Sequence, residues 1–368
     1  MSDAVFAGVM SGTSLDGIDA VVARFPESDA IRPFEIIGST FLPFPNDLKA
    51  ELFALQNSGN DEIARASRAA WALAELYAQT VCTAADIAGI KVSAIKAAGI
   101  HGQTVRHCPQ QSWTCQVNNP ARVAELLGID VVADFRSRDL AAGGQGAPLT
   151  PMFHKSLLGD APDSAVLNIG GMANVTILDS AGKVIGFDTG PGNVLLDTWY
   201  AQHHDGAFDR DGAWAATGNV MSELLQQMLD DPFFAQKPPK STGRDHFNGH
   251  WLQQQSARFS YQNAQDVQAT LLMLTATSIT QALKPFNANH VYVCGGGAHN
   301  QALMTRLAEL LAPCSVESTQ MIGVAPEHVE ALAFAWLARE ALARRALDLT
   351  SVTGACHASI LGAIYPGG

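Results

Sequence analysis

The stretch GVMSGTSLDGIDAVVARF, residues 8–25, decides the fold of this chain. Two apolar runs, residues 5–9 and 18–22, flank a polar turn, and such runs predict two strands joined as a hairpin. The segment that joins them, residues 10–19, holds two glycines, three hydroxyl side chains and two carboxylates. The sequence therefore predicts a hairpin whose turn is unusually rich in small polar groups.

The turn has a structural and a functional interpretation. Gly, Ser and Asp dominate ordinary turns because they tolerate positive φ and cap backbone groups, so a purely structural hairpin is one alternative. The same composition can wrap N–H groups and hydroxyls around a phosphate while a carboxylate organises Mg²⁺. Under the second interpretation, Asp16 and Asp19 are candidate Mg²⁺ ligands, directly or through water. The phosphate-binding candidates are Gly12, Thr13, Ser14, Leu15, Asp16, Gly17, Ile18 and Asp19.

A second segment repeats this architecture. Residues 164–188 read SAVLNIGGMANVTILDSAGKVIGFD. They predict a strand over residues 165–169, a turn at Gly170 and Gly171, a strand over 175–178, and a third strand ending at Asp188. The residues of the two segments barely match, but the order of strand, small-residue turn and returning strand is the same. This order indicates an internal duplication of architecture, with Asn174 just beyond the second turn.

Length and composition set the outer bounds. A chain of 368 residues exceeds the size at which one core keeps growing, so two domains are expected, and 47% hydrophobic residues can fill them. No apolar run reaches the roughly 20 residues needed to cross a bilayer, and the N-terminus shows no basic segment followed by an apolar one. We expect a soluble cytoplasmic protein that does not bind membranes.

Charge and cysteine usage exclude other classes. The formal net charge of −12 argues against nucleic-acid binding, which needs a basic face. The six cysteines form no CxxC pair and are expected to be reduced. His107, Cys108 and Cys115 raise the question of zinc, but no second ligand pair has the usual spacing.

The middle of the first half predicts alternating helices and strands. A helical pattern covers residues 61–85, and residues 94–100 read as a buried strand. Asn118 and Asn119 are expected to cap a helix that begins at Pro120 and ends before Gly128, ahead of a strand over 129–133. Ligands of α/β sheets gather beyond the carboxyl ends of strands, so the segments after residues 100 and 133 are candidate substrate sites.

These two segments are polar. The first reads HGQTVRH, residues 101–107, and the second reads DFRSRDLAAGGQGAP, residues 134–148. Arg136 suits a carboxylate ligand and the neighbouring aspartates suit sugar hydroxyls, although a loop of mutually paired surface charges is an equal alternative. The glycines that follow predict a hinge, with a domain boundary near residues 143–150.

Two further segments of the second half suggest chemistry. Asp188 lies in GFDTGPGN, between a strand and a helix expected from about Asn193, where a general base could stand near a transferring phosphoryl group. Its alternative role is a cap, but Asn193 and Asp197 can serve that helix. A strand over residues 290–294 leads into GGGAHN, whose glycines allow a nucleotide close to the backbone, followed by a helix over 301–311. The nucleotide candidates here are Gly295, Gly296 and Gly297.

In this order, these segments resemble the superfamily of actin, sugar kinases and heat-shock ATPases. Within it, the chain resembles the anhydro-N-acetylmuramic acid kinases from about residue 8 to the C-terminal GAIYPG. The strings that carry the resemblance are GVMSGTSLDGID, HGQTVRH, DFRSRD, NIGGMANVT, GFDTGPGN, CGGGAHN and PEHVEALAFAWLA.

The resemblance implies a fold of two actin-like, ribonuclease H-like α/β domains with mixed sheets flanked by helices. The expected domains are residues 1–143 completed by 348–368, and residues 144–347. It also implies a homodimer that uses ATP, Mg²⁺ and water to open 1,6-anhydro-N-acetylmuramic acid and phosphorylate O6. Asp188 would be the general base on the water.

The remaining roles on the sugar also follow from the resemblance. Arg136 would bind the lactyl carboxylate, and His101 and Thr104 would bind other polar groups of the sugar. Glu330 would contact the sugar or its acetamido group, whereas Glu327 is expected only to favour the helix dipole.

Two alternatives stay open at this point, and two other classes of nucleotide-binding protein are disfavoured. The chain has no GxxxxGK[ST] string and no GxGxxG in a βαβ unit, which disfavours P-loop and dinucleotide-binding proteins. Another sugar or acetate kinase of the superfamily would phosphorylate a free hydroxyl or carboxylate without water. A non-catalytic ATP-binding protein could use the same scaffold.

Overall fold

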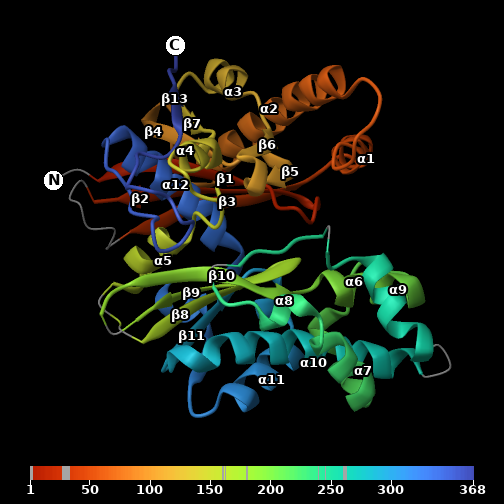
Figure 1. Ribbon diagram of the computed structural model, residues 1–368. Coiled ribbons are helices and arrows are strands. Elements are labelled where there is room, and N and C mark those ends of the chain that lie inside the picture. The colour runs from red at the N-terminus through yellow and green to blue at the C-terminus, as the bar shows by residue number, and fades with distance from the viewer. Residues whose placement is uncertain are drawn as a thin grey trace. The chain divides into compact units, whose positions relative to one another are not determined.

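The computed structural model describes residues 3–26, 34–159, 161, 163–179, 181–238, 240–244, 246–259 and 263–368. The chain divides into two compact units (Figure 1). The first unit comprises Met1–Leu157 together with His328–Gly368, and the second comprises Leu158–Glu327. Each unit is built around one mixed β-sheet.

The first unit contains a six-stranded sheet. Its first hairpin pairs β1 with β2 in antiparallel fashion, and β3 continues that pattern on the outside. On the other side of β1, the strands β4 and β7 run parallel to it, and β13 closes the edge in antiparallel fashion. The strand order is β13 (Ala363–Tyr365), β7 (Asp130–Ala133), β4 (Ile95–Ile100), β1 (Ala4–Met10), β2 (Gly17–Phe25), β3 (Glu35–Pro43).

The sheet of the second unit repeats this arrangement. Three antiparallel strands come first in sequence, and two parallel strands follow on the other side of the first of them. The strand order is β10 (Val184–Pro191), β9 (Met172–Leu178), β8 (Ser164–Ile169), β11 (His290–Cys294), β12 (Ser315–Ser318). Both units thus share the order 3-2-1-4-5 with the same strand directions, which is the topology of the predicted actin-like fold. The expected internal duplication is confirmed.

Helices cover both faces of the first sheet. The inner residues of β1, such as Val9, form one core cluster with α2 (Glu62–Ile87) and α3 (Pro120–Leu127), in which Tyr77 is fully buried. The alternate residues face α12 (Val329–Leu342). A Cβ on Gly8 would come within 1.9 Å of the Ala331 carbonyl oxygen, and one on Gly99 within 2.0 Å of the Phe334 carbonyl oxygen. Glycine at both positions therefore lets this apolar helix lie directly on β1 and β4.

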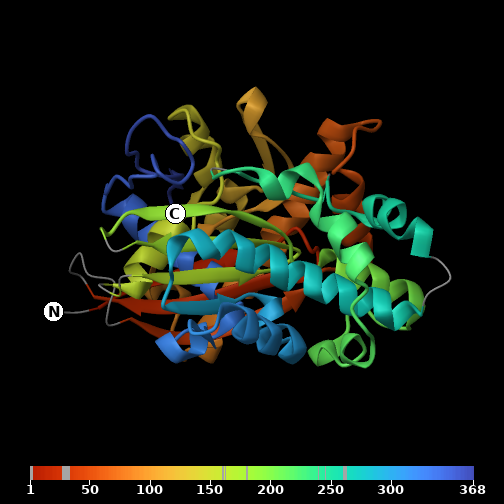
Figure 2. The same cartoon turned by 60° about the horizontal axis from the view of Figure 1, so that its bottom comes forward.

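The core of the second unit lies on one face of its sheet. Residues such as Leu167 and Val175 pack with α6 (Val194–His203), α10 (Ala264–Leu283) and α11 (Gln301–Leu311). Figure 2 brings this side forward and shows α10, in cyan, crossing the strands. No helix in the described part of the chain is long and apolar enough to span a membrane.

The other elements are short. The first unit also contains α1 (Asn46–Ala54), α4 (Phe135–Ala141) and the hairpin of β5 (Gln103–Cys108) and β6 (Trp113–Val117), while α5 (Pro151–Leu158) crosses into the second unit. The second unit also contains α7 (Ser222–Leu229), α8 (Pro232–Ala235) and α9 (Gly249–Ser256).

Two local expectations need correction. The segment after β7 is not a loop, because residues 135–141 form α4. Its buried Asp139 accepts hydrogen bonds from the Thr353 hydroxyl at 2.8 Å and from the Gly146 N–H at 2.7 Å. Asp139 therefore anchors the glycine-rich segment to the C-terminal part of the first unit rather than facing a ligand.

The division into units also differs from the predicted domain boundaries. Residues 144–157 and 328–347, expected in the second domain, belong to the first unit. The reason is packing: the Gln145 N–H donates to the Thr353 carbonyl at 2.9 Å, and α12 lies on β1 and β4. The glycine-rich stretch that suggested a hinge is thus bonded within the first unit.

Candidate functional site

The polar turn between β1 and β2 is built around one carboxylate. The Ser14 hydroxyl donates to Oδ1 of Asp16 at 2.6 Å, and the Gly17 N–H donates to the same oxygen at 3.1 Å. Thr13, Ser14 and Asp16 are exposed, so their polar groups face solvent. The turn therefore offers hydroxyls, backbone N–H groups and a carboxylate to a ligand, as the phosphate hypothesis requires.

Other residues of the predicted phosphate segment are part of the core. Leu15 and Ile18 are buried in the cluster beneath the sheet, so a ligand can reach only their backbone groups. A Cβ on Gly17 would come within 2.5 Å of the Leu42 carbonyl oxygen, which explains that glycine by packing. Leu15 has φ of 56°, a left-handed conformation that costs a leucine about 1–2 kcal/mol. The turn is held in a strained shape by its buried side chain.

His101 and Arg136 meet beyond the carboxyl ends of β4 and β7. The Arg136 Nε–H donates to Nε2 of His101 at 2.9 Å, and Nη1 donates to the Gly146 carbonyl at 3.1 Å. His101 is buried, and burial together with the Arg136 guanidinium holds the pKa of its imidazole well below the usual value. The imidazole is therefore neutral, and because Nε2 accepts from Arg136, its proton is on Nδ1.

Glu330 completes this cluster from the first turn of α12. Burial raises the pKa of its carboxyl; the Arg136 guanidinium lowers it and the Asp16 carboxylate raises it further. One turn later, the Phe334 ring lies 4.9 Å from the His101 ring, centroid to centroid. The packing of α12 thus places Glu330 near Arg136 and Asp16. The structure thus brings together four predicted site residues from four separate segments of the sequence: Asp16, His101, Arg136 and Glu330.

Thr104 and His107 lie on β5, next to this cluster. The Thr104 hydroxyl accepts from the Gln116 side chain at 3.2 Å across the hairpin. Nδ1 of His107 bonds with the Thr114 hydroxyl at 2.9 Å. Burial, reinforced by the Arg136 guanidinium, lowers the pKa of His107 to about 4. In the described part of the chain, His107, Cys108 and Cys115 do not form a metal-binding group.

Asp188 belongs to a polar row across the second sheet. Strand pairing places it opposite Asn174, and Asn174 opposite Asn168. Side chains at paired positions share a face, and the neighbouring Phe187 belongs to the core on the other face. Asn168, Asn174 and Asp188 therefore lie side by side on the face opposite that core.

The expected position of Asp188 at a strand end needs correction. β10 continues to Pro191, and a register shift lies between Asp188 and Gly190. Such bulges re-aim a side chain and recur next to active sites. Asn193 also does not cap α6 as expected; its side-chain N–H donates to the Ile169 carbonyl at 3.3 Å.

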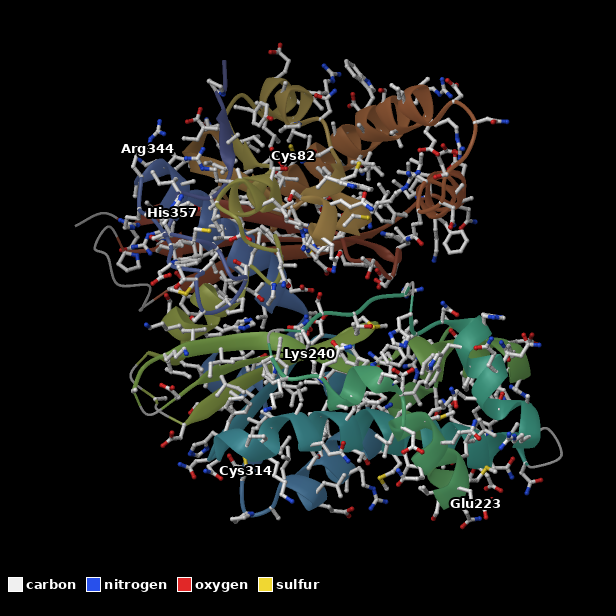
Figure 3. All side chains as sticks on the ribbon, viewed as in Figure 1. Cys82, Glu223, Lys240, Cys314, Arg344 and His357 are labelled. Carbon is white, nitrogen blue, oxygen red and sulfur yellow. The ribbon has the colours of Figure 1, made fainter. Side chains whose placement is uncertain are left out.

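A segment that the sequence analysis did not single out supports Asp188. The Thr242 N–H donates to Oδ2 of Asp188 at 2.9 Å, and the Asp188 N–H donates to the Lys240 carbonyl at 3.1 Å. The Lys240 ammonium donates to the Phe233 carbonyl at 3.3 Å; burial lowers its pKa, and the Asp188 carboxylate opposes that shift. Figure 3 labels Lys240 on this segment, beside β10. The carboxylate of Asp188 thus has a fixed orientation and a cation nearby.

The glycine turns of the second unit are bonded to the segment that follows Asp188. The N–H groups of Asn193 and Val194 donate to the carbonyls of Gly170 and Gly171 at 2.8 and 3.1 Å. Gly192 must be glycine, because a Cβ there would lie 2.4 Å from the Gly170 carbonyl oxygen. Backbone hydrogen bonds therefore join the predicted nucleotide turn directly to the start of α6.

The glycine triplet lies at the carboxyl end of β11, next to that of β8. A Cβ on Gly295 would come within 2.4 Å of Oδ1 of Asn168, and one on Gly297 within 2.4 Å of Cγ2 of Ile169. Packing therefore accounts for these two glycines. Gly296 is exposed, and its surroundings leave room for a ligand.

The donor set for a divalent cation is small. Across the described ranges, no three His, Cys, Asp or Glu side chains gather to hold a metal ion. Asp16 nevertheless presents an exposed carboxylate with one oxygen fixed by two donors, and Asp19 lies three residues further on, at the start of β2. One or two carboxylates suit Mg²⁺, which keeps several waters and takes its other ligands from phosphates.

Two further polar residues lie at these sites and were not predicted from the sequence. Gln103 is fully buried, and its side chain donates to the Gly12 carbonyl in the turn between β1 and β2. Asn168 is buried in the polar row beside Asn174, and its Oδ1 has no partner among the described residues. Both lie inside the strings that carried the resemblance. The signal that could have found them is a polar side chain at a position where the strand pattern predicts burial.

Comparisons with known proteins identify the family of this chain. A family model for anhydro-N-acetylmuramic acid kinase matches residues 4–367. The chain is 50% identical over 394 residues to the anhydro-N-acetylmuramic acid kinase of Albidiferax ferrireducens, covering 100% of both chains. It is also 50% identical over 367 residues to that of Pseudomonas syringae pv. tomato, covering 99% of this chain and 100% of the relative.

Among solved structures, the chain is similar to a ROK family glucokinase from Streptomyces griseus in complex with glucose and AMPPNP. The TM-score is 0.41 at 15% sequence identity, and the match covers 91% of this chain and 99% of the glucokinase. The family model and the two full-length relatives decide the assignment. This chain belongs to the anhydro-N-acetylmuramic acid kinase family.

Proposed function

We propose that this protein uses ATP and water to convert 1,6-anhydro-N-acetylmuramic acid into N-acetylmuramic acid 6-phosphate and ADP. The family membership of the whole chain and the names of its relatives support this reaction. The observation in the structure that supports it best is Asp188, a carboxylate fixed by the Thr242 N–H in a polar row of strand residues. A fixed carboxylate of this kind suits the activation of a water.

The proposed chemistry balances as one hydrolysis and one transfer. Asp188 takes a proton from water as the water oxygen bonds to C1 of the sugar. The bond between C1 and O6 breaks, and O6 takes the γ-phosphoryl group as the bond between the β and γ phosphates breaks. Catalysis of phosphoryl transfer rests mainly on positioning and electrostatic stabilisation, so a fixed base and well-ordered turns are the parts required.

On the sugar, we assign the carboxylate of the lactyl group to Arg136. The guanidinium is oriented by His101 and the Gly146 carbonyl, which suits a planar, charge-assisted contact. His101 and Thr104 would bind other polar groups of the sugar. Glu330 would accept from a hydroxyl or from the acetamido N–H. Its surroundings mix a cation and a carboxylate, so they suit a polar sugar rather than an apolar ligand.

For the nucleotide, we assign the phosphates to the turn at residues 12–19, with Asp16 and Asp19 toward Mg²⁺. When bound, Mg²⁺ would neutralise charge that develops on the phosphates. Gly170, Gly171 and Gly296, with Asn174 beside Asp188, are further candidates for contacts with the nucleotide. Gly295 and Gly297 have an indirect role, because the absence of a Cβ lets the glycine triplet pack closely against Asn168 and Ile169.

A comparison of acceptors tests the proposal. The purified protein with ATP and Mg²⁺ should release ADP with 1,6-anhydro-N-acetylmuramic acid and form one sugar 6-phosphate for each ADP. Glucose, N-acetylglucosamine and acetate should give at most background. Efficient phosphorylation of one of these with no turnover of the anhydro sugar would instead assign the protein as another kinase of the superfamily. ATP binding without turnover of any acceptor would favour a non-catalytic role.

We also propose a cytoplasmic homodimer, which the family resemblance supports. Light scattering of the purified protein coupled to size exclusion gives the mass directly. A mass of twice 39.0 kDa is expected, and a monomer at all working concentrations would contradict the dimer.

A further inference from the structure

Gln103 joins two segments that the proposed function assigns to different substrates. It is the first residue of β5, and its side chain is fully buried. Its Nε2 donates to the Gly12 carbonyl at 3.1 Å and to the Thr104 carbonyl at 3.2 Å. Both partners are acceptors, so the amide nitrogen must face them. Gln103 thus lies among the sugar-segment residues 101–104 and reaches into the phosphate turn.

The Gly12 carbonyl is the point at which the turn is held. It also accepts from the Leu15 N–H at 3.2 Å, which closes the turn over residues 12–15. Leu15 adopts the left-handed conformation described above, so the turn keeps its shape only because neighbouring contacts fix it. Among the residues that the structure describes, Gln103 is the side chain that donates to this carbonyl from outside the turn.

The backbone brings the same two segments together. The His101 N–H donates to the Val9 carbonyl at 3.1 Å, just before the turn. A different support comes from α2, where the Tyr77 hydroxyl lies 2.9 Å from Oγ of Ser11. Tyr77 belongs to neither substrate segment. Gln103 and Tyr77 are thus two buried side chains of the described residues that form hydrogen bonds with the turn, and Gln103, unlike Tyr77, is continuous with the residues assigned to the sugar.

We propose that Gln103 is a positioning residue that couples sugar binding to nucleotide binding. When the sugar fixes His101 and Thr104, Gln103 holds the Gly12 carbonyl, and with it the turn, in the arrangement that accepts phosphates. By linkage, a nucleotide on the turn strengthens sugar binding by the same factor. This inference rests on the proposed function, since it takes the sugar and phosphate assignments from there.

The test compares two variants that each remove one buried hydrogen bond to the turn. Gln103→Met keeps the length of the side chain and removes the amide, and Tyr77→Phe removes only the hydroxyl. For each protein, calorimetry gives the Kd of the anhydro sugar alone and with a saturating non-hydrolysable ATP analogue and Mg²⁺. The ratio of the two Kd values is the coupling factor. Thermal melting shows that each variant is folded.

We expect the sugar to bind wild type more tightly in the presence of the nucleotide. The coupling factor should fall by about fivefold in Gln103→Met, the effect of losing the buried hydrogen bond to the Gly12 carbonyl, and should stay within about twofold in Tyr77→Phe. A coupling factor of one in wild type, or equal factors in wild type and a folded Gln103→Met, would overturn the proposal. Equal losses in both variants would also overturn it, because they would show a general loosening of the turn.

These outcomes are distinct from a failure of the proposed function. If wild type turns over the anhydro sugar and Gln103→Met keeps full coupling, only the role of Gln103 is wrong. If wild type neither binds nor turns over the anhydro sugar, the sugar assignment itself fails, and the coupling role falls with it.

Discussion

Arg136 donates through Nε–H to Nε2 of His101 at 2.9 Å, and this bond orders the polar cluster of the first unit. It fixes the imidazole as a neutral ring with its proton on Nδ1, and it fixes the plane of the guanidinium. The same guanidinium lowers the pKa of Glu330, which burial raises. One arginine therefore sets the state of two other residues that we assign to the sugar.

Replacing Arg136 should weaken sugar recognition. In Arg136→Met, the charge that we assign to binding the lactyl carboxylate is lost, and the pKa of Glu330 rises further because the opposing cation is gone. We expect kcat/KM for the anhydro sugar to fall by about 50-fold, mainly through KM, since hydrogen bonds to charged groups contribute about 1.5–3 kcal/mol. Steady-state kinetics at varied sugar concentration measures this split.

Arg138→Met is the matched control. Arg138 lies two residues further along α4, its side chain is exposed, and the change removes the same charge. Its kinetics should stay near wild type. If the two variants lose activity equally, the effect comes from the charge of α4 and not from the position of Arg136.

Replacing Asp188 should affect turnover rather than binding. Asp188→Asn keeps the size of the side chain and an oxygen that accepts from the Thr242 N–H, but it removes the base. We expect kcat to fall by about 10³-fold or more. The Kd values of sugar and of an ATP analogue, measured by calorimetry, should change by less than about threefold.

Glu223→Gln is the control for this substitution, because Glu223 is exposed on α7, as Figure 3 shows. It makes the same change from carboxylate to amide in the same unit, and it should keep wild-type turnover. An Asp188→Asn variant that retains a kcat within about tenfold of wild type would remove Asp188 from the proposed mechanism.

His107 should make the stability of the protein depend on pH. The unfolded chain takes up this proton near pH 6.5, whereas the folded protein takes it up only near pH 4. Between these values the unfolded state holds more protons, so this contribution to stability is complete above about pH 6.5 and is lost as the pH falls towards 4. In His107→Gln, the free energy of unfolding should decrease less steeply across that range.

Chemical denaturation at a series of pH values measures this difference. His154, whose pKa burial lowers to about 3, acts in the same direction in both proteins, so the comparison isolates His107. Identical slopes for wild type and His107→Gln between pH 6.5 and 4 would show that His107 titrates normally in the folded state.

Gly8 should be essential for the packing of α12. The methyl group of Gly8→Ala would lie within 1.9 Å of the Ala331 carbonyl oxygen, so the helix must move off β1. We expect a loss of about 3 kcal/mol in the free energy of unfolding. Gly89→Ala is the comparison: φ is 67°, but no atom lies within 4 Å, so only the conformational cost of about 1 kcal/mol remains. Equal losses would contradict the close approach.

Much of the fold could be predicted because it is encoded in local patterns. Alternating and apolar runs predicted the hairpin at residues 8–25 and the strand of residues 290–294. Asn119 accepts from the Arg122 N–H and Gly128 ends α3 with φ of 64°, as cap residues at those positions predict. The duplication followed from comparing the order of elements, which the strand orders of both sheets confirm.

Contacts between distant parts of the chain could not be predicted. Gln103 and Gly12 are 91 positions apart, and Thr242 and Asp188 are 54 apart, so no local pattern relates them. The prediction that the aspartates of DFRSRD bind sugar hydroxyls failed at Asp139 for this reason. Asp139 is buried against Thr353, which lies near the end of the chain. The hinge predicted from the glycines near residue 143 failed for the same reason, because the neighbouring Gln145 N–H also bonds to the distant Thr353. Composition indicates flexibility, whereas hydrogen bonds from elsewhere decide it.

The most direct test of the central claim is to run the reaction in ¹⁸O-labelled water. The purified protein is incubated with ATP, Mg²⁺ and 1,6-anhydro-N-acetylmuramic acid, and the product is analysed at once by mass spectrometry with fragmentation. The proposal predicts one ¹⁸O atom at C1 and an unlabelled phosphate on O6, with one ADP per product. ADP released without a ring-opened sugar phosphate, or a phosphorylated sugar whose anhydro bridge is intact, would contradict it.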